Sequence, residues 1–69
     1  MRAREVNSRI ESLGGQFLRQ KGSHRLYRVT REGVSVMAVV PQHGGDIPTG
    51  TLRAIERSLE EVLGKGWLR

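Results

Sequence analysis

The sequence predicts a small α+β domain with the element order α-β-β-β-α, in which two helices cover one face of a three-stranded antiparallel sheet. Three observations predict this fold. Apolar residues recur with helical spacing near both ends of the chain, β-prone segments lie between them, and short Gly-containing turns separate these segments. Each helix has one apolar stripe to bury, and an antiparallel sheet offers one apolar face that both can cover. We therefore expect residues 1–69 to form a single domain.

The first expected helix lies at the start of the chain. Its apolar residues are spaced at i, i+3, i+7 and i+10, as on one side of a helix: Ala3, Val6, Ile10 and Leu13. Gly14 and Gly15 follow, where a left-handed residue commonly ends a helix. This helix is therefore expected to end before residue 14.

The first two expected strands form a hairpin. Residues 16–20 are a short mixed segment that we interpret as a strand, and Lys21-Gly22-Ser23 predicts the turn after it. Residues 24–31 alternate between apolar and polar side chains, which favours a second strand.

A third strand and a long loop follow. Glu32-Gly33 predicts a tight turn, and residues 34–40 contain four valines, which favour a strand that Pro41 ends. Residues 41–50, "PQHGGDIPTG", are rich in Gly and Pro and predict the long loop of the domain.

The second expected helix begins after this loop. Thr49 or Thr51 is expected to cap it, and its apolar stripe repeats the spacing of the first: Leu52, Ile55, Leu59 and Val62. Gly64 is expected to end the helix. The short tail contains Trp67, which we expect to close the open end of the core.

Alternation along the strands predicts which side chains face the helices. The set expected toward the helices is Phe17, Tyr27, Val29, Val34, Val36, Ala38 and Val40. The set expected on the uncovered side is Leu18, His24, Leu26, Arg28, Met37 and Val39. A register slip of one residue would exchange the faces of a strand, and both interpretations are open at this point.

Basic residues are concentrated in the first half of the chain. Residues 1–31 carry eight basic and two acidic side chains, whereas residues 32–69 carry four and five. Five cations lie between residues 16 and 31 without any acid: Arg19, Lys21, Arg25, Arg28 and Arg31. Ten of the twelve basic residues are arginine, whose planar guanidinium can bind a phosphate through two hydrogen bonds. This pattern favours a nucleic-acid partner over a merely solvated surface.

The composition excludes several classes of protein. The chain has no cysteine, so it has neither disulfides nor a cysteine metal site, which fits a reducing cytoplasm. No apolar run approaches the roughly 18 residues of a membrane span, and Arg2 follows Met1 directly, which argues against a signal peptide. His43 and Asp46 share a loop, but two ligands do not make a metal site. We therefore expect no membrane association, no metal and no cofactor.

His24 is the candidate catalytic residue, because it lies between a Gly-Ser turn and a basic strand. RNA carries its own nucleophile, the 2′-hydroxyl, so an imidazole that exchanges protons near neutral pH and a few cations suffice for cleavage. The backbone N–H groups of Gly22 and Ser23 are expected to reach a phosphate oxygen. The cations expected to bind the RNA are Arg19, Lys21, Arg25 and Arg28. A purely structural role for this histidine is the alternative.

Two motifs give the chain a resemblance to a known family. "GSHRLY", preceded by "FLRQK", is followed at Pro41 by "PQHGGDIPTGTLRAIERSL". In this order, from Ile10 to about Leu59, they resemble the HicA (YcfA-like) toxins of toxin–antitoxin systems. The resemblance implies a fold like a double-stranded-RNA-binding domain and metal-independent cleavage of messenger RNA by the histidine of the Gly-Ser-His motif, here His24. It also implies a HicB-like antitoxin that binds and blocks the toxin in the cytoplasm.

The resemblance is incomplete after the second motif. Glu56, Glu60 and Glu61 make the second helix less basic than in the family. His43 matches the family's loop histidine and is a secondary candidate, with hydrogen bonding to the backbone as its alternative role. Two other functions stay open: a non-catalytic RNA-binding module of the same fold, and a subunit whose basic face binds an acidic protein.

Overall fold

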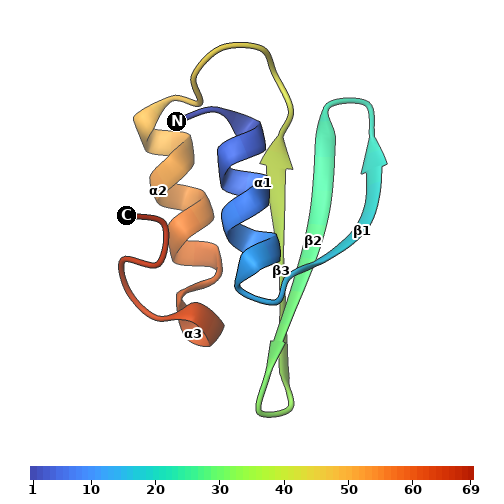
Figure 1. Cartoon of the computed structure of the whole chain (residues 1–69), viewed down its shortest axis with the longest axis vertical. Coiled ribbons are helices and arrows are strands. Elements are labelled where there is room, and N and C mark those ends of the chain that lie inside the picture. Colours follow the sequence, from blue (N-terminus) through green and yellow to red (C-terminus); the bar gives the residue numbers. More distant parts are fainter.

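A layer of helices packs against one face of a three-stranded sheet in the computed structural model, which describes all residues 1–69 (Figure 1). The elements in chain order are α1 (Ala3–Ser12), β1 (Gln16–Lys21), β2 (His24–Arg31), β3 (Val34–Pro41), α2 (Thr49–Ser58) and α3 (Glu60–Leu63). The predicted order α-β-β-β-α is confirmed, with the second predicted helix divided into α2 and α3. None of these helices combines the length and the apolar character that a membrane span requires.

The sheet has the order β1-β2-β3 and is antiparallel throughout. β2 pairs with β3 without interruption, from His24 opposite Pro41 to Arg31 opposite Val34. Between β1 and β2 the register shifts, because Leu18 is an extra residue that forms a bulge. β2 is therefore the central strand, and its side chains reach both faces of the sheet.

Two-residue turns join the strands. In the turn between β2 and β3, Glu32 and Gly33 both have left-handed φ angles, 51° and 81°, as a type I′ turn requires. In the turn between β1 and β2, Gly22 has φ 58°, as at the first position of a type II′ turn. Lys21 is the last residue of β1, so this turn is one residue shorter than predicted.

The core lies between the helices and the sheet. Its thirteen buried apolar residues come from the helices, β2, β3, the loop before α2 and the C-terminal tail: Ala3, Val6, Ile10, Tyr27, Val29, Ala38, Val40, Ile47, Ile55, Leu59, Val62, Trp67 and Leu68. The predicted strand alternation is confirmed for β2 and β3. Phe17 and Val34 are 53% and 40% exposed, because β1 and the end of the β2–β3 hairpin extend past the helices (Figure 1).

The start and the continuity of the second helix differ from the prediction. Neither Thr49 nor Thr51 caps α2; Pro48 is the N-cap residue, without a side-chain cap hydrogen bond, and its carbonyl accepts from the N–H of Leu52 at 3.0 Å. The predicted single helix is also interrupted at Leu59, whose φ of −112° is not helical. Its apolar stripe is thus divided between α2 and α3.

The C-terminal tail covers the open end of the core, as predicted for Trp67. Gly64, with φ 85°, ends α3 and lets the chain reverse. The indole Nε1 of Trp67 donates to the carbonyl of Glu56 at 2.7 Å. The Glu56 carboxylate is buried, with Oε1 3.5 Å from a guanidinium nitrogen of Arg69 and Oε2 without a partner. The tail is therefore fixed to α2.

Candidate functional site

The face of the sheet opposite the helices carries the candidate site. We call it the open face; on β2 it consists of His24, Leu26 and Arg28, which alternate with buried or tethered residues. Two exposed apolar side chains of β3, Met37 and Val39, accompany them. The predicted outward set is therefore confirmed on β2 and β3, and the alternative of a register slip in these strands is wrong. Leu18 is the exposed bulge residue of β1, and its place on the open face stays a prediction.

His24 is the first residue of β2 and is exposed. It directly follows the Gly22-Ser23 turn and stands opposite Lys21 on one side and Pro41 on the other. Residues directly opposite each other in antiparallel strands project to the same face. An imidazole and an ammonium group thus lie side by side at the end of the open face.

The bulge in β1 decides which cations accompany His24. In a regular strand with Phe17 on the helix side, Arg19 and Lys21 would lie on the helix side as well. The extra residue reverses the alternation, so that Arg19 and Lys21 pair with the outward residues of β2. Both cations therefore belong to the open face.

The arginines of β2 are divided between the two faces. Arg28 lies on the open face, where its guanidinium donates to Oε1 of Gln16 at 3.1 Å. Arg25 lies on the helix side, where its Nε donates to Oε1 of Gln20 at 2.9 Å and its guanidinium stacks 5.0 Å from the ring centre of Phe17. The structure thus brings Arg28 together with His24 but separates Arg25 from it.

Arg25 belongs to a partly buried polar network that the sequence did not reveal. Its Nη1 donates to the Tyr27 hydroxyl at 3.4 Å, and this hydroxyl donates to the Glu11 carboxylate of α1. Burial of the phenol and its hydrogen bond to Glu11 raise the pKa of Tyr27 above its ordinary value of 10.0, while Arg25 acts in the opposite direction. The network anchors the β1–β2 hairpin to α1.

All charged side chains of the three strands are basic. None of the three strands contains Asp or Glu, and all five cations predicted between residues 16 and 31 lie on them. Both α1 and α2 begin at the end of the molecule that also carries the Gly22-Ser23 turn and the loop of His43 (Figure 1). The strands of the sheet therefore carry cations without acids, and carboxylates are present beside the start of α1, where Glu5 accepts from the N–H of Arg2.

His43 is an exposed residue of the loop that follows β3, two positions after the partner of His24. The backbone N–H of the preceding Gln42 donates to the carbonyl of Ser23 at 2.6 Å. The loop histidine is thus carried by a segment that is hydrogen bonded to the Gly22-Ser23 turn. No group of three or more His, Asp or Glu side chains gathers anywhere in the molecule as a metal site would need.

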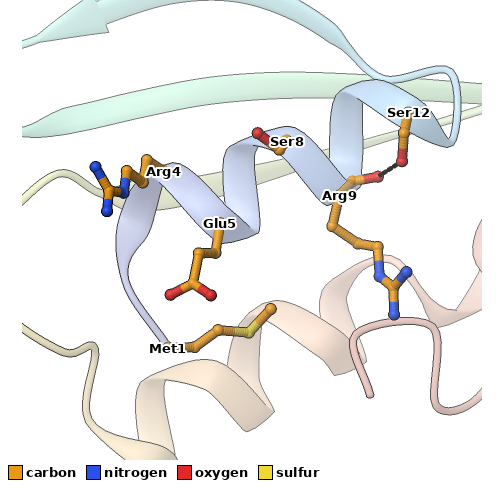
Figure 2. Close-up of a pocket in the computed structure, with 6 residues that line it drawn as sticks. All are labelled: Met1, Arg4, Glu5, Ser8, Arg9 and Ser12. Carbon is orange, nitrogen blue, oxygen red and sulfur yellow. Dashed lines mark hydrogen bonds between the residues drawn. The ribbon is translucent and has the colours of Figure 1, made fainter.

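A separate groove runs along the outer side of α1, with a volume of about 580 Å³ (Figure 2). It is lined by Met1, Arg4, Glu5, Ser8, Arg9 and Ser12. Figure 2 shows Glu5 and Arg9 projecting toward α2 and the C-terminal tail, and Arg9 donates to the carbonyl of Arg69 at 2.8 Å. None of the predicted site residues lines this groove.

Comparison with protein families gives one match. The sequence model of the HicA toxin of bacterial toxin–antitoxin systems matches residues 3–61. The matched segment begins with α1, ends within α3 and contains His24 and all the other predicted site residues. No curated protein and no solved structure matches the chain.

Proposed function

The chain belongs to the HicA toxin family of bacterial toxin–antitoxin systems, and from this premise we propose that it is a metal-independent endoribonuclease that cleaves messenger RNA. The observation that carries the proposal is the placement of His24. It is an exposed imidazole on an acid-free sheet, opposite Lys21 and on the same face as Arg19 and Arg28. Cleavage of messenger RNA would stop translation and growth, as expected of a toxin.

The proposed reaction uses the nucleophile of the substrate. His24 removes the proton of a 2′-hydroxyl, the 2′-oxygen attacks the adjacent phosphorus, and the bond to the 5′-oxygen breaks. The 5′-oxygen leaves with a proton from a general acid or from water. The products are a 2′,3′-cyclic phosphate and a 5′-hydroxyl, so no redox step or external co-reactant is needed. Histidine suits this role because imidazole exchanges protons near neutral pH.

The cations of the open face supply binding and charge stabilisation in this proposal. Arg19, Lys21 and Arg28 can contact the phosphodiester backbone on either side of the scissile phosphate, where negative charge grows in the transition state. The N–H groups of the Gly22-Ser23 turn can approach the phosphate closely, since nothing lies within 4 Å of the position that a side chain on Gly22 would occupy. DNA lacks the 2′-hydroxyl and would not be cleaved.

We further propose that a HicB-like antitoxin covers the open face in the cytoplasm. Leu18, Met37 and Val39 are 36%, 56% and 48% exposed, and apolar surface of this kind between cations is typical of an interaction site. A partner with apolar and acidic side chains would complement the face and enclose His24. The product would be an inactive toxin–antitoxin hetero-oligomer.

Cleavage of labelled RNA in the presence of EDTA tests the proposed activity. We expect the wild type to generate 2′,3′-cyclic phosphate ends and His24→Ala to lose about 10²–10⁴-fold in rate, the usual contribution of a general acid or base. The variant should keep its RNA affinity, because the cations remain, and it should no longer arrest growth. Cleavage by His24→Ala at the wild-type rate, or a strict requirement for a divalent metal, would contradict the mechanism.

The same experiment decides between the ribonuclease and the alternative of an RNA-binding module. The cations of the open face favour RNA binding whether or not His24 reacts. Wild-type protein that binds RNA without cleaving it would establish the binding module. Protein that neither binds nor cleaves RNA would favour a subunit that only binds an acidic protein.

A further inference from the structure

We propose that Gln42, held by Asn7 of α1, is a positioning residue that aligns the His24 turn with the loop carrying His43. The inference rests on the proposed ribonuclease function and adds to it two residues that touch neither RNA nor the reacting atoms. Sequence analysis singled out neither of them.

β3 ends at Pro41, opposite His24. Proline has no backbone N–H, but at the position opposite His24 an N–H of β3 would point away from β2, so no bond of the ladder is lost. The next residue, Gln42, continues the ladder, because its N–H donates to the carbonyl of Ser23 at 2.6 Å. This bond joins the residue that precedes His24 to the residue that precedes His43.

The side chain of Gln42 ties the same point to the helix layer. Its amide exchanges two hydrogen bonds with Asn7: Nδ2 of Asn7 donates to Oε1 of Gln42 at 2.8 Å, and Nε2 of Gln42 donates to Oδ1 of Asn7 at 3.1 Å. Nε2 also donates to the carbonyl of Val40 at 3.0 Å. Asn7 is only 6% exposed, so the anchor is largely shielded from competing water.

The side chain of Gln42 points toward the helices, on the opposite side from Pro41. Successive side chains along an extended backbone point to opposite sides. Pro41 pairs with His24 and lies on the open face, whereas the side chain of Gln42 reaches α1. His43 is the residue that follows Gln42 in the chain. In this proposal the Asn7–Gln42 pair therefore fixes the backbone from which the loop histidine starts, relative to the Gly22-Ser23 turn and His24.

Acid–base catalysis depends strongly on such spacing, and a displacement of about 1 Å can lower a rate by about 10²-fold. The test replaces both partners by apolar residues of similar shape, in the double variant Asn7→Leu/Gln42→Met. Removing both partners leaves no buried amide unpaired, so stability should be nearly kept. Ser58→Ala is the matched control, because it removes another partly buried side-chain hydrogen bond, to the carbonyl of Ile55, away from the turn.

Two measurements on the full chain read out positioning. In steady-state cleavage of a short labelled RNA, we expect the double variant to lose about 10- to 100-fold in kcat, with KM little changed because the cations are intact. Hydrogen exchange of the residue 42 amide, followed by NMR, should accelerate by at least about tenfold, since the end of the strand pair opens more often. Ser58→Ala should change neither quantity.

The outcomes separate this inference from the proposed function. Wild-type kcat in a folded double variant overturns the positioning role, whether or not amide exchange accelerates. If the double variant does not fold, Gln42→Glu replaces it in the test. This substitution removes the two N–H donors of Nε2 and keeps the oxygen that accepts from Asn7. Absence of cleavage by the wild type refutes the ribonuclease itself. In that case, hydrogen exchange of the residue 42 amide alone tests whether the Asn7–Gln42 pair aligns the His24 turn with the His43 loop. An unchanged exchange rate in the double variant refutes this alignment.

Discussion

The two faces of β2 differ in how their polar side chains are held. On the helix side, Arg25 and Tyr27 are tied into a network that includes Glu11 and Gln20. On the open face, His24 is exposed and stands among cations rather than acids. The polar groups of the helix side join the hairpin to α1, whereas on the open face Arg28 bonds only within the sheet, to Gln16, and His24 is exposed to solvent. One strand thus contributes to both the core and the candidate site.

The first way to test this comparison is to remove one side chain from each face. Tyr27 is fully buried, and truncating a buried aromatic residue to alanine destabilises a protein by about 3–5 kcal/mol. A domain of this size has a total stability of roughly 3–10 kcal/mol, so Tyr27→Ala should lose a large part of it. His24→Ala should change stability by no more than about 1 kcal/mol. Urea unfolding followed by circular dichroism measures both.

A stable Tyr27→Ala protein would show that the network to Glu11 contributes little to the fold. Unfolding by His24→Ala would assign His24 a structural role and undermine its use as an accessible catalytic group.

The second test adds a charge to the apolar part of the open face. We expect Leu26→Lys to weaken binding of the antitoxin at least about tenfold, because an ammonium group buried against apolar side chains loses its hydration. Isothermal titration calorimetry with the purified partner measures this change. Thr30→Lys is the control, since it adds the same charge to an exposed residue farther along β2 and should have a smaller effect.

Leu26 is only half-buried, so the Leu26→Lys variant should keep its fold. If the substitution unfolds the domain instead, Leu26 belongs to the core and the description of the open face is incorrect at this residue.

The third and smallest expected effect concerns the two arginines. Each phosphate contact that is lost should lower the salt dependence of RNA affinity by about 0.7–0.9 in the log–log slope. Arg28→Ala should show this change, because its side chain lies on the open face. Arg25→Ala should leave the slope nearly unchanged, because its guanidinium is engaged with Gln20 and Phe17. Equal slopes for Arg28→Ala and the wild type would remove Arg28 from the proposed RNA path.

Most of the fold could be predicted because short-range patterns dictate it. The stripe that includes Val6 and Ile10 has helical spacing and is buried as predicted, and Gly33 and Gly64 occur where left-handed backbone is needed. The cap of α2 was predicted wrongly because threonine is favoured at N-caps only when its side chain can reach a free N–H. Thr49 is instead the first residue inside the helix, after Pro48.

The buried polar contacts could not be predicted, although one signal was present. Asn7 lies within the apolar stripe of α1, and a polar residue there needs a buried partner. Its partner, Gln42, is 35 residues away along the chain, and nothing local identifies it. Glu11 and Tyr27 are a similar case, since their contact depends on how α1 crosses the sheet.

The sequence by itself determined the order of the elements and the place of His24 beside a Gly-Ser turn, and it left two registers open for the faces of β2 and β3. Only the tertiary structure decided which cations share the face of His24. The bulge at Leu18 reverses the alternation of β1 and moves Arg19 and Lys21 to the open face, while Arg25 is retained on the helix side. The physical reason is that alternation is a local rule, whereas register is set by pairing with a neighbouring strand. β1 is an edge strand whose residues are all exposed. Its sequence therefore has no buried apolar face that would specify the register.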